Sequence, residues 1–567
     1  MKPSWTWPGT ARRCAGPDTA RWLLTGWLVL LGLTGIDFDA RGASEDANVR
    51  IGEAIYRHGL LGTGQPLQGS RAEDGPVVSG ADAACVNCHQ RSGLGTAEAN
   101  VSIPPVTGRY LFHPRAERGD EFYLPYVPGV RSNREPYTED TLVRALRDGI
   151  DAQGRPLSYL MPRFALNDAD AAALVAYLKS LDMPRPPGVT DTVLHFATIV
   201  TPDADPVKRD GVLDVLQHYF TDKNSFQFGP SARLQSSGKT MYSKTMYMVN
   251  RRWQLHIWTL TGPPSTWGAQ LDRHFAQEPV LAVVSGIGGA VWAPVHDFCE
   301  RQAVPCLFPN VDAPTYEAGD FYTLYFSRGV LLEAELMSKA ILDARRGAAA
   351  PSVAQIYRDG DSGAAAAAAL EAALAPAGVA VRNHVIPAGA DAAQLRAAVR
   401  KAGHASALAL WLRPADLAAL GDAPLAGDVY LSGLMGGLDD SPLPTAWRER
   451  ARMTYPFDLP DKRLVRVDYA LGWLSIRHVP IVSQRVQVDT YLACGLLAEA
   501  LSHMRDTFVP AYLVEELQSM VEHRVITGYY PHLALGTGQT FASKGGYLVQ
   551  LPSSGGRLVA DSAWVVP

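Results

Sequence analysis

Cysteine, net basic charge and long apolar runs are all scarce in this sequence of 567 residues. Six cysteines are too few for a scaffold built on disulfides. Lysine and arginine number 52 against 57 aspartates and glutamates, so no basic excess indicates a nucleic-acid partner. The longest apolar run, residues 22–36, is shorter than the roughly 20 residues of a membrane-spanning helix. A chain of this length with 47% hydrophobic residues is expected to form about three or more globular units.

Motifs of common catalytic sites are also absent. The sequence has no G-x-S-x-G, no H-E-x-x-H and no P-loop. The glycines of "SGIGGAVWAP" (Gly286, Gly288 and Gly289) lack the G-x-G-x-x-G spacing of a dinucleotide site. We expect instead a tight strand-to-helix turn whose backbone N–H groups a small ligand can approach. The sequence therefore predicts a protein that is not an enzyme, with no catalytic residue.

The cysteines that are present include the motif C-x-x-C-H, formed by Cys85, Cys88 and His89. In this spacing both thiols add to the vinyl groups of a haem, and the adjacent imidazole becomes an axial ligand of the iron. A zinc site would need a second close pair of ligands, and none follows. A redox dithiol does not need the histidine, and the loop-like stretch upstream differs from the usual setting of such a motif. The motif predicts one covalently attached haem c.

Haem is attached to such motifs outside the cytoplasm, and an export signal precedes this one. Basic residues come before the apolar run of residues 22–36, and a small-residue cleavage site follows it at residues 40–42. We predict a signal peptide over residues 1–42 and localisation in the periplasm. The alternative is an uncleaved anchor in the inner membrane, because the basic segment before the run is long.

Residues 47–182 are predicted to form a small helical domain. The apolar spacing of "VRIGEAIYRHG" indicates one helix. Thr138 is a candidate N-cap for a second helix that stops at Gly149, and a third helix is expected to begin at Asn167 or Asp168. Such a domain has too little side-chain core for its size, and a haem would supply the missing apolar centre.

A six-coordinate haem needs a second axial ligand besides the histidine of the motif. Met161 lies in a loop before the last helix, where Pro162 stiffens the backbone, and it is the favoured candidate. Met183 follows that helix in what reads as the domain exit, and His58 and His113 are the remaining alternatives.

This segment resembles a class I cytochrome c, especially the c-type units that accompany quinoprotein alcohol dehydrogenases. The resemblance rests on "CVNCH", the following "RSGLG", and "MPRFALNDADAAALVAYLKSL". It implies haem attachment at Cys85 and Cys88 and ligation of the iron by His89 and Met161. It also implies electron transfer with a periplasmic redox partner, for which a quinoprotein dehydrogenase and a terminal oxidase chain are candidates.

A proline-rich linker, residues 183–191, separates this domain from a second pattern over residues 192–567. Nearly continuous apolar runs such as "TVLHFATIV" are typical of strands covered on both faces. They alternate with helical segments such as "RDGVLDVLQHYF", which predicts parallel, doubly wound sheets, with enough units for two. The predicted fold is thus an all-α cytochrome c domain followed by a two-lobed α/β domain.

The second part resembles type 1 periplasmic binding proteins, the substrate-binding components of branched-chain amino acid and amide ABC transporters. The match follows "EPVLAVVSGIGGAVWAPVHDFCERQAVPCLFPNVDAPT" and "SVAQIYRDGDSGAAAAAALEAALAPAGVAV", and it ends at "TGYYPHLALGTGQTFASKGGYLVQL". The resemblance implies two lobes that close over a small molecule, lined by the loops that follow the strands. By position these loops supply Ser285, Gly286, Gly288, Asn310, Asp312, Ser362, Trp411 and Arg413.

Two of these loops depart from the family. The turn that holds an α-carboxylate in the family reads "GIGG" here, and the family's stacking tyrosine is Ser362, so an amino acid is not assigned as the ligand. For Trp411 the alternative is packing inside a lobe, and for Arg413 it is an exposed position at the rim.

The remaining cysteines do not form a further motif. Cys299 and Cys306 lie seven residues apart, and both a disulfide between them and two free thiols are open in an oxidising compartment. Cys494 in "YLACGLLAEAL" is expected in the core of a helix.

Together these features predict a periplasmic monohaem cytochrome c that transfers one electron and is coupled to a domain that binds a small molecule. The alternative is a solute-binding receptor for a transporter or sensor, in which the haem is ancillary.

Overall fold

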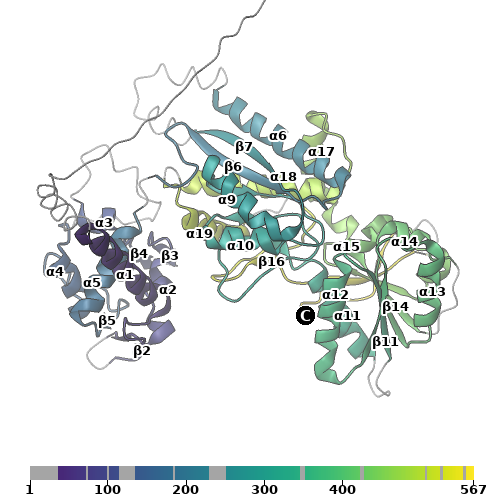
Figure 1. Cartoon of the computed structure of the whole chain (residues 1–567), viewed down its shortest axis with the longest axis horizontal. Helices are drawn as coiled ribbons and strands as arrows, with labels where there is room; N and C mark the ends of the chain where they lie inside the picture. The colour runs from purple at the N-terminus through teal and green to yellow at the C-terminus, as the bar shows by residue number, and fades with distance from the viewer. Residues whose placement is uncertain are drawn as a thin grey trace, which may run out of the picture. The chain divides into compact units, whose positions relative to one another are not determined.

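The computed structural model describes residues 36–71, 75–98, 101–113, 135–182, 185–228, 251–344, 352–421, 427–504, 507–523, 528–552 and 557–567. Within these ranges the chain forms two compact units (Figure 1). The first takes the described residues up to Asn87 together with 107–113 and 135–182, and the second takes those of 88–106 and from 185 onwards. The two units are described separately.

The first unit is built on the crossing of two helices, α1 (Ile36–His58) and α5 (Asp168–Ser180). Gly52 permits their close approach, because a Cβ atom there would lie 2.1 Å from the carbonyl oxygen of Ala173. Tyr56 and Tyr177 pack beside the crossing, with ring centres 5.2 Å apart. The other helices are α3 (Gly108–Phe112) and α4 (Glu139–Asp148).

Capping residues place the helices of the first unit where the sequence predicts them. Thr138 caps α4, and its hydroxyl accepts a hydrogen bond from the backbone N–H of Thr141 at 3.2 Å. Gly149 ends the helix in the left-handed conformation at φ 68°. The amide oxygen of Asn167 caps α5 by accepting from the N–H of Asp170 at 2.8 Å. The predicted limits of these two helices are confirmed.

A small sheet corrects the prediction that this unit is all-α. Three short antiparallel strands lie in the order β2-β1-β5. They are β1 (Gln68–Ser70), β2 (Val77–Ser79) and β5 (Arg163–Phe164). Runs of two or three residues carry too little alternation to be recognised in the sequence.

The second unit contains two large sheets, and the first of them is six-stranded and parallel, in the order β16-β10-β9-β8-β6-β7. We call this sheet and its helices lobe one. Its strands are β6 (Val193–Val200), β7 (Arg252–Thr259), β8 (Ala282–Val284), β9 (Cys306–Leu307), β10 (Thr323–Ser327) and β16 (Phe541–Ser543). Helices α6 (Pro206–Phe228), α18 (Gln484–Met504) and α19 (Pro510–Met520) cover one face, and α9 (Trp267–Gln277) and α10 (Ala293–Arg301) cover the other.

Lobe two is the seven-stranded sheet of order β12-β11-β13-β14-β15-β17-β18 with its helices. Its first five strands are parallel, and β17 and β18 are antiparallel. The strands are β11 (Val353–Arg358), β12 (Val381–Ile386), β13 (Ala407–Trp411), β14 (Asp428–Ser432), β15 (Ala451–Tyr455), β17 (Tyr547–Gln550) and β18 (Val559–Ala560). The helices are α11 (Val330–Ala344), α12 (Gly363–Leu374), α13 (Ala392–Ala402), α14 (Pro414–Ala418), α15 (Gly433–Gly436) and α16 (Thr445–Arg448). Helix α17 (Pro460–Ile476) packs against α6 and α18 of lobe one.

The predicted two-lobed α/β architecture is confirmed by these two sheets. Strand β8 is wholly buried, as expected for an apolar run covered on both faces. The chain passes between the sheets after β10, again between β15 and β16, and a third time after β16. The carboxyl ends of the parallel strands carry the loops that form the site described below.

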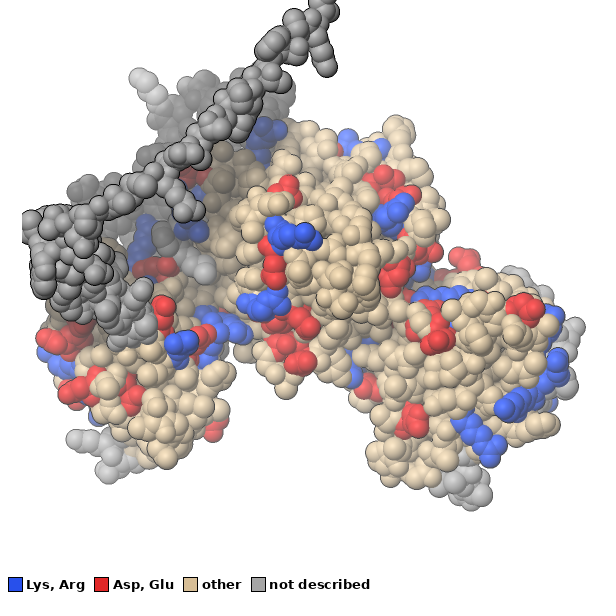
Figure 2. Space-filling view, viewed as in Figure 1, with Lys and Arg blue, Asp and Glu red and all other residues tan. Residues whose placement is uncertain are grey.

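None of the helices in the described part of the chain is long and apolar enough to cross a membrane. The predicted apolar run of the signal lies outside that part except for Ile36, and α1 runs through the predicted cleavage site at residues 40–42. Figure 2 shows basic and acidic side chains interspersed on the visible face, without a large patch of one sign.

Glu333 of α11 is a completely buried carboxylate in lobe two. Its Oε1 accepts hydrogen bonds from the backbone N–H groups of Gly433 (2.8 Å) and Leu434 (3.0 Å) and from the hydroxyl of Thr454 (2.9 Å). The hydroxyl of Ser432 donates to Oε2. Burial raises the pKa of Glu333 to about 7, although these hydrogen bonds lower it. The side chain thereby fixes the start of α15 at the edge of the cleft.

We predict that Glu333 makes the second unit more stable at low pH. Its folded pKa lies above the unfolded value, so the native state binds the extra proton, and stability is lost as the pH rises through about 7. Glu333→Gln keeps an acceptor at Oε1 and offers a donor to Ser432. Between about pH 5.5 and 8.5 the free energy of unfolding, measured by urea denaturation, should fall less in the variant, by on the order of 1–3 kcal/mol. An unchanged pH slope in Glu333→Gln would contradict this role.

Candidate functional site

The haem motif lies on a single turn of helix. Helix α2 (Val86–His89) carries Cys88 and His89, and Cys85 directly precedes it. Cys85 is buried and Cys88 is half-buried. The motif therefore presents its two nucleophilic sulfurs one helical turn apart, at the spacing that covalent haem attachment uses.

His89 is held in one orientation by the hairpin that follows it. Strands β3 (Thr96–Glu98) and β4 (Val101–Ile103) pair antiparallel and lead directly into Pro104. The carbonyl oxygen of Pro104 lies 2.9 Å from Nδ1 of the imidazole, which is only 7% exposed. Burial lowers the pKa of His89, and the bond to Pro104 opposes this only in part, so the ring is neutral at pH 7. The proton sits on Nδ1, and Nε2 keeps the lone pair that an axial ligand needs.

The predicted second axial ligand lies in a turn of the first unit. Met161 is half-buried, and its N–H donates to the carbonyl oxygen of Ser158 at 3.0 Å. The alternatives His58 and His113 are both exposed, and Met183 lies outside the described residues. A thioether that is partly sheltered is a better candidate for a buried axial ligand than an exposed imidazole, but the assignment of Met161 stays a prediction.

The residues present fit a haem c. Two thiols in the C-x-x-C-H spacing and a buried, neutral imidazole fixed through Nδ1 are the donor set that this cofactor requires. Cys85 and Cys88 would hold the porphyrin, and His89 and Met161 would ligate the iron. Such a group supplies a reversible one-electron change between ferric and ferrous iron.

A second candidate site lies between the two lobes of the second unit, where Arg413 joins them. Its Nη1 pairs with Oδ2 of Asp312 in lobe one at 2.7 Å, and its Nε and Nη2 pair with Asp361 in lobe two at 2.8 and 2.5 Å. Ser362 accepts a further hydrogen bond from Nη2 at 2.9 Å. Burial alone would raise the pKa of Asp312, but Arg413 and Lys208 lower it overall. The cleft is thus closed by an ion pair that the protein itself supplies.

Beside this ion pair lies a cavity with about 420 Å³ of empty space, the open solvent at its mouth included. Its lining combines prolines and aromatic rings with a few polar side chains. The residues are Pro309, Asn310, Val311, Pro314, Tyr325, Phe326, Ser327, Gly329, Leu434, Phe457, Arg485, Asp489 and Tyr530. Both lobes contribute, so opening or closing of the lobes changes access to this space.

The polar end of the cavity is an ion pair on helix α18. Nη1 of Arg485 lies 2.8 Å from Oδ2 of Asp489, one helical turn further on. The hydroxyl of Tyr530 lies 3.4 Å from the same oxygen. Burial raises the pKa of Asp489 to about 6, while Arg485 lowers it. The pair therefore remains largely ionised at neutral pH.

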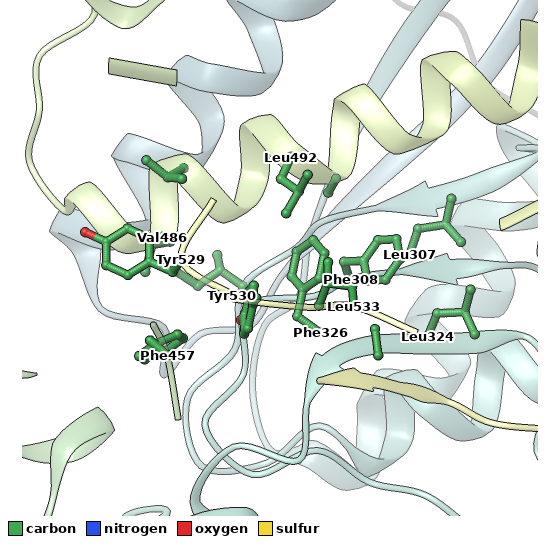
Figure 3. Close-up of a cluster of buried hydrophobic side chains, with 14 of the residues drawn as sticks. Leu307, Phe308, Leu324, Phe326, Phe457, Val486, Leu492, Tyr529, Tyr530 and Leu533 are labelled. Atoms are coloured by element: carbon green, nitrogen blue, oxygen red, sulfur yellow. The ribbon is translucent and has the colours of Figure 1, made fainter. Parts of the chain in front are cut away.

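Aromatic rings form the apolar side of the cavity. Figure 3 shows Phe308, Phe326, Tyr530 and Phe457 following one another from the core of lobe one towards lobe two. Phe308 and Phe326 stack at 4.2 Å, and Tyr530 lies 5.3 Å from Phe326 and 5.4 Å from Phe457, measured between ring centres.

At residues 287–290 the predicted turn does not offer free N–H groups. The N–H of Ile287 donates to Ile199, and that of Gly288 to Asn310. Those of Gly289 and Ala290 donate to the carboxylate of Asp203, at 3.3 and 2.9 Å. The expectation that a ligand approaches these groups is therefore corrected, because residues 287–290 satisfy them internally.

The other predicted ligand residues divide between the cleft and the core. Asn310 lines the cavity and donates to the hydroxyl of Ser285, which is buried and also bonds to Thr490 of α18. Asp312, Ser362 and Arg413 form the network between the lobes, so Arg413 is not an exposed rim residue. Ser285 is a structural link between β8 and α18.

Trp411 is corrected to a packing role. It is 1% exposed in the core of lobe two, and its indole N–H donates to Oε1 of Gln355 at 3.1 Å. Its side chain leaves β13 towards α12 because alternate residues of a strand point to opposite faces.

Sequence reasoning missed Arg485, Asp489 and Tyr530. The first two stand four residues apart in "SQRVQVDTYL", which is also the spacing of an ordinary surface ion pair on a helix. Tyr530 follows residues 524–527, which are not described, and precedes β16 in a loop. One sequence signal could have identified Arg485 and Asp489. They are charged residues in an otherwise apolar helix, and such a helix is expected to be buried, where charges need a partner.

Cys299 and Cys306 are both buried free thiols in this structure. They are close enough for a hydrogen bond, and burial followed by this contact raises the pKa of Cys299 well above its ordinary value. The bridge that the sequence left open is therefore not formed here, and its formation on oxidation stays a prediction. Cys494 is buried in α18, as expected.

Comparison with protein families identifies the haem-binding part. Residues 72–182 match the family model for cytochrome c. This segment is a cytochrome c domain. The resemblance predicted from its motifs is confirmed, and the match covers the part of the chain that carries C-x-x-C-H.

Solved structures similar to the chain include substrate-binding proteins of ABC transporters. The fatty acid ABC transporter substrate-binding protein from Thermomonospora curvata is 16% identical, with a TM-score of 0.49, and the match covers 68% of this chain and 95% of that one. A branched-chain amino acid ABC transporter protein from Thermus thermophilus with bound valine is 11% identical, with a TM-score of 0.47, and the match covers 67% of this chain and 97% of that one. A putative branched-chain amino acid ABC transporter protein from Rhodospirillum rubrum is 16% identical, with a TM-score of 0.44, and the match covers 65% of this chain and 100% of that one. Comparison with curated proteins gives no match.

We predict that Met161→Ala removes the second axial ligand. A thioether favours ferrous iron, so its loss should lower the midpoint potential and open the iron to added imidazole. The weak far-red band of the oxidised protein, which the family resemblance implies, should disappear from the absorption spectrum. Met183→Ala is the control and should change none of these. If His113→Ala shifts the spectrum and Met161→Ala does not, the ligand assignment is wrong.

Proposed function

We propose that this chain is an exported monohaem cytochrome c that carries one electron in the periplasm and binds a small molecule between its two C-terminal lobes. The predicted domain limits, 47–182 and 192–567 with a linker at 183–191, belong to this proposal. The electron comes from or goes to a periplasmic redox protein, for which a quinoprotein dehydrogenase remains a candidate partner. No catalytic residue is assigned.

One observation carries the electron-transfer part of the proposal. The imidazole of His89 is buried, neutral and oriented by the carbonyl of Pro104, directly after two cysteines in the C-x-x-C spacing. A thioredoxin-like dithiol has no use for such an imidazole, and no group of three or more potential metal-binding side chains occurs among the described residues to complete a zinc site. Haem supplies the chemistry that this arrangement fits.

The cleft supports the ligand-binding part. Its cavity is lined from both lobes, by aromatic rings together with a few polar side chains. The ion pair of Arg413 with Asp312 shows that the closed arrangement is accessible to the chain. Closure of two lobes over a ligand is the general way in which such hinged domains report occupancy.

Coupling between the two functions is supported by contacts of the haem-binding segment within the second unit. The N–H of Ser92, three residues after His89, donates to Oε1 of Glu515 at 2.8 Å. The guanidinium of Arg91 lies 4.6 Å from the ring centre of Phe321. Glu515 belongs to α19, which packs against α18, the helix that carries the charged pair of the cavity. A change at either end of this path therefore reaches the other through two packed helices.

We predict that Cys85→Ala and Cys88→Ala each weaken covalent haem attachment, and that the double variant abolishes it. Each thioether bond needs its own thiol, so one bond remains in a single variant. Peroxidase staining of a denaturing gel measures the covalent haem, and Cys494→Ala, outside the motif, is the matched control. Normal staining of the double variant would remove the basis of the proposed electron transfer.

We predict that ligand affinity depends on the redox state of the haem. Reduction removes one positive charge from the iron, and the path through Ser92 and Glu515 should pass this change to the cleft with a coupling of about fivefold in the dissociation constant. Calorimetry on oxidised and reduced protein with small alcohols, amines and acids measures it. Glu515→Gln should reduce the difference without changing the haem spectrum. Affinity that is independent of redox state would favour the alternative, a solute receptor with an ancillary haem.

A further inference from the structure

We propose that the cavity between the lobes selects a neutral small molecule with an apolar body and one hydroxyl or amide N–H group, which donates to Asp489. This inference rests on the proposed function, because it assumes that the cleft binds a small molecule. It adds the chemical class of that molecule, which neither the haem motif nor the fold determines.

The hydrogen-bond donor of the ligand is required by one unpaired oxygen. The side chain of Asp489 is 2% exposed and lines the cavity. Its Oδ2 is paired with Arg485 and faces the hydroxyl of Tyr530, whereas its Oδ1 has no hydrogen-bond partner among the described residues. A buried carboxylate oxygen without a donor is unfavourable, so an O–H or N–H group from a bound molecule stabilises it.

The apolar body of the ligand follows from the rest of the lining. Phe326 and Tyr530 from lobe one and Phe457 from lobe two border the cavity, and Leu434 adds an aliphatic side chain (Figure 3). These surfaces offer contact area to a ring or a branched chain but few partners for additional polar groups.

Net neutrality of the ligand follows from the balance of charges at the cleft. Arg485 already compensates Asp489, and Arg413 compensates Asp312 and Asp361, with Lys208 as a further nearby cation. Three basic groups thus face these three acidic ones, with Asp205 near Lys208 as a fourth acidic group. An added anion or cation would have to break one of these buried pairs or stay uncompensated.

A carboxylate, and with it an α-amino acid, is disfavoured by the turn after β8. Its four N–H groups at residues 287–290 are used inside the protein, two of them by the carboxylate of Asp203. A ligand carboxylate finds no free donor there and meets the negative charge of Asp203. The protein's own carboxylate thus occupies the place where a helix-terminal turn could hold an acid.

The test uses isothermal titration calorimetry on the full, haem-loaded protein at about pH 7.5, where Asp489 is ionised. The probes are benzyl alcohol and four comparison molecules. Benzyl methyl ether, benzylamine and benzoate keep the phenyl ring and change the polar group, and valine represents the amino acids. We expect benzyl alcohol to bind, and the other four to bind at least tenfold more weakly. The ether is the matched control, because it keeps the oxygen but has no hydrogen to donate to Asp489. Asp489→Ala should weaken benzyl alcohol binding at least tenfold, with an unchanged haem spectrum as evidence of folding.

The outcomes separate this inference from the function beneath it. Equal affinity for the alcohol and the ether would overturn the role of Asp489. Tighter binding of benzoate, benzylamine or valine would overturn the ligand class while leaving the proposed binding function in place. Failure of all five probes to bind would overturn both the ligand class and the proposed binding function. Because the comparison of alcohol and ether uses the unaltered protein, it decides the question even if Asp489→Ala does not fold.

Discussion

The ion pair between Arg413 and Asp312 is the interaction on which the cleft depends. Removing a guanidinium and a carboxylate from water costs several kcal/mol unless each finds a partner, and here the partners stand on different lobes. Asp361 shares the guanidinium from lobe two, so the cation is fully paired only while the lobes are together. The cavity beside it is consequently formed from both lobes. Its lining, its charge balance and its access all follow from the pairing of these three residues.

The same requirement, that a buried polar group be paired, organises the haem-binding segment. Gly95 directly precedes β3 and lies against the end of β4, where its φ is 74° and a Cβ atom would lie 2.1 Å from the carbonyl oxygen of Ile103. This close approach lets the hairpin place Pro104 beside Nδ1 of His89. The backbone geometry at Gly95 therefore helps to hold the carbonyl of Pro104 against Nδ1 of His89. The short loop between His89 and the hairpin also leaves the N–H of Ser92 free to donate to Glu515. Orientation of the imidazole and contact with α19 thus share one structural cause.

Local chemistry made most of the fold predictable. Caps such as Thr138 and Asn167, the stop at Gly149 and the apolar runs of β6 and β13 depend on neighbours in sequence, and all of them were found where expected. The site was predictable only in part. Arg413 and Asp312 were recognised from the positions of their loops, but their pairing could not be predicted, because residues far apart in the sequence meet only in the folded chain. Asp489 and Arg485 have a spacing common on exposed helices, and the sequence contains no sign that Asp203 satisfies the turn at residues 289–290.

A neutral ligand has a consequence for how the two halves of the protein communicate. If binding neither adds nor removes charge, the field at the iron changes little through long-range electrostatics, which salt and solvent screen over about 10 Å. Coupling must then pass through packing and hydrogen bonds. The available elements are α18, which presents Asp489 to the cavity, and α19, whose Glu515 accepts from Ser92. Burial raises the pKa of Glu515 to about 7 despite the hydrogen bonds it accepts, so this contact is formed by a carboxylate near the balance between its two protonation states. The Ser92–Glu515 hydrogen bond joins the segment after His89 to α19, so it is the contact through which the proposed coupling would pass.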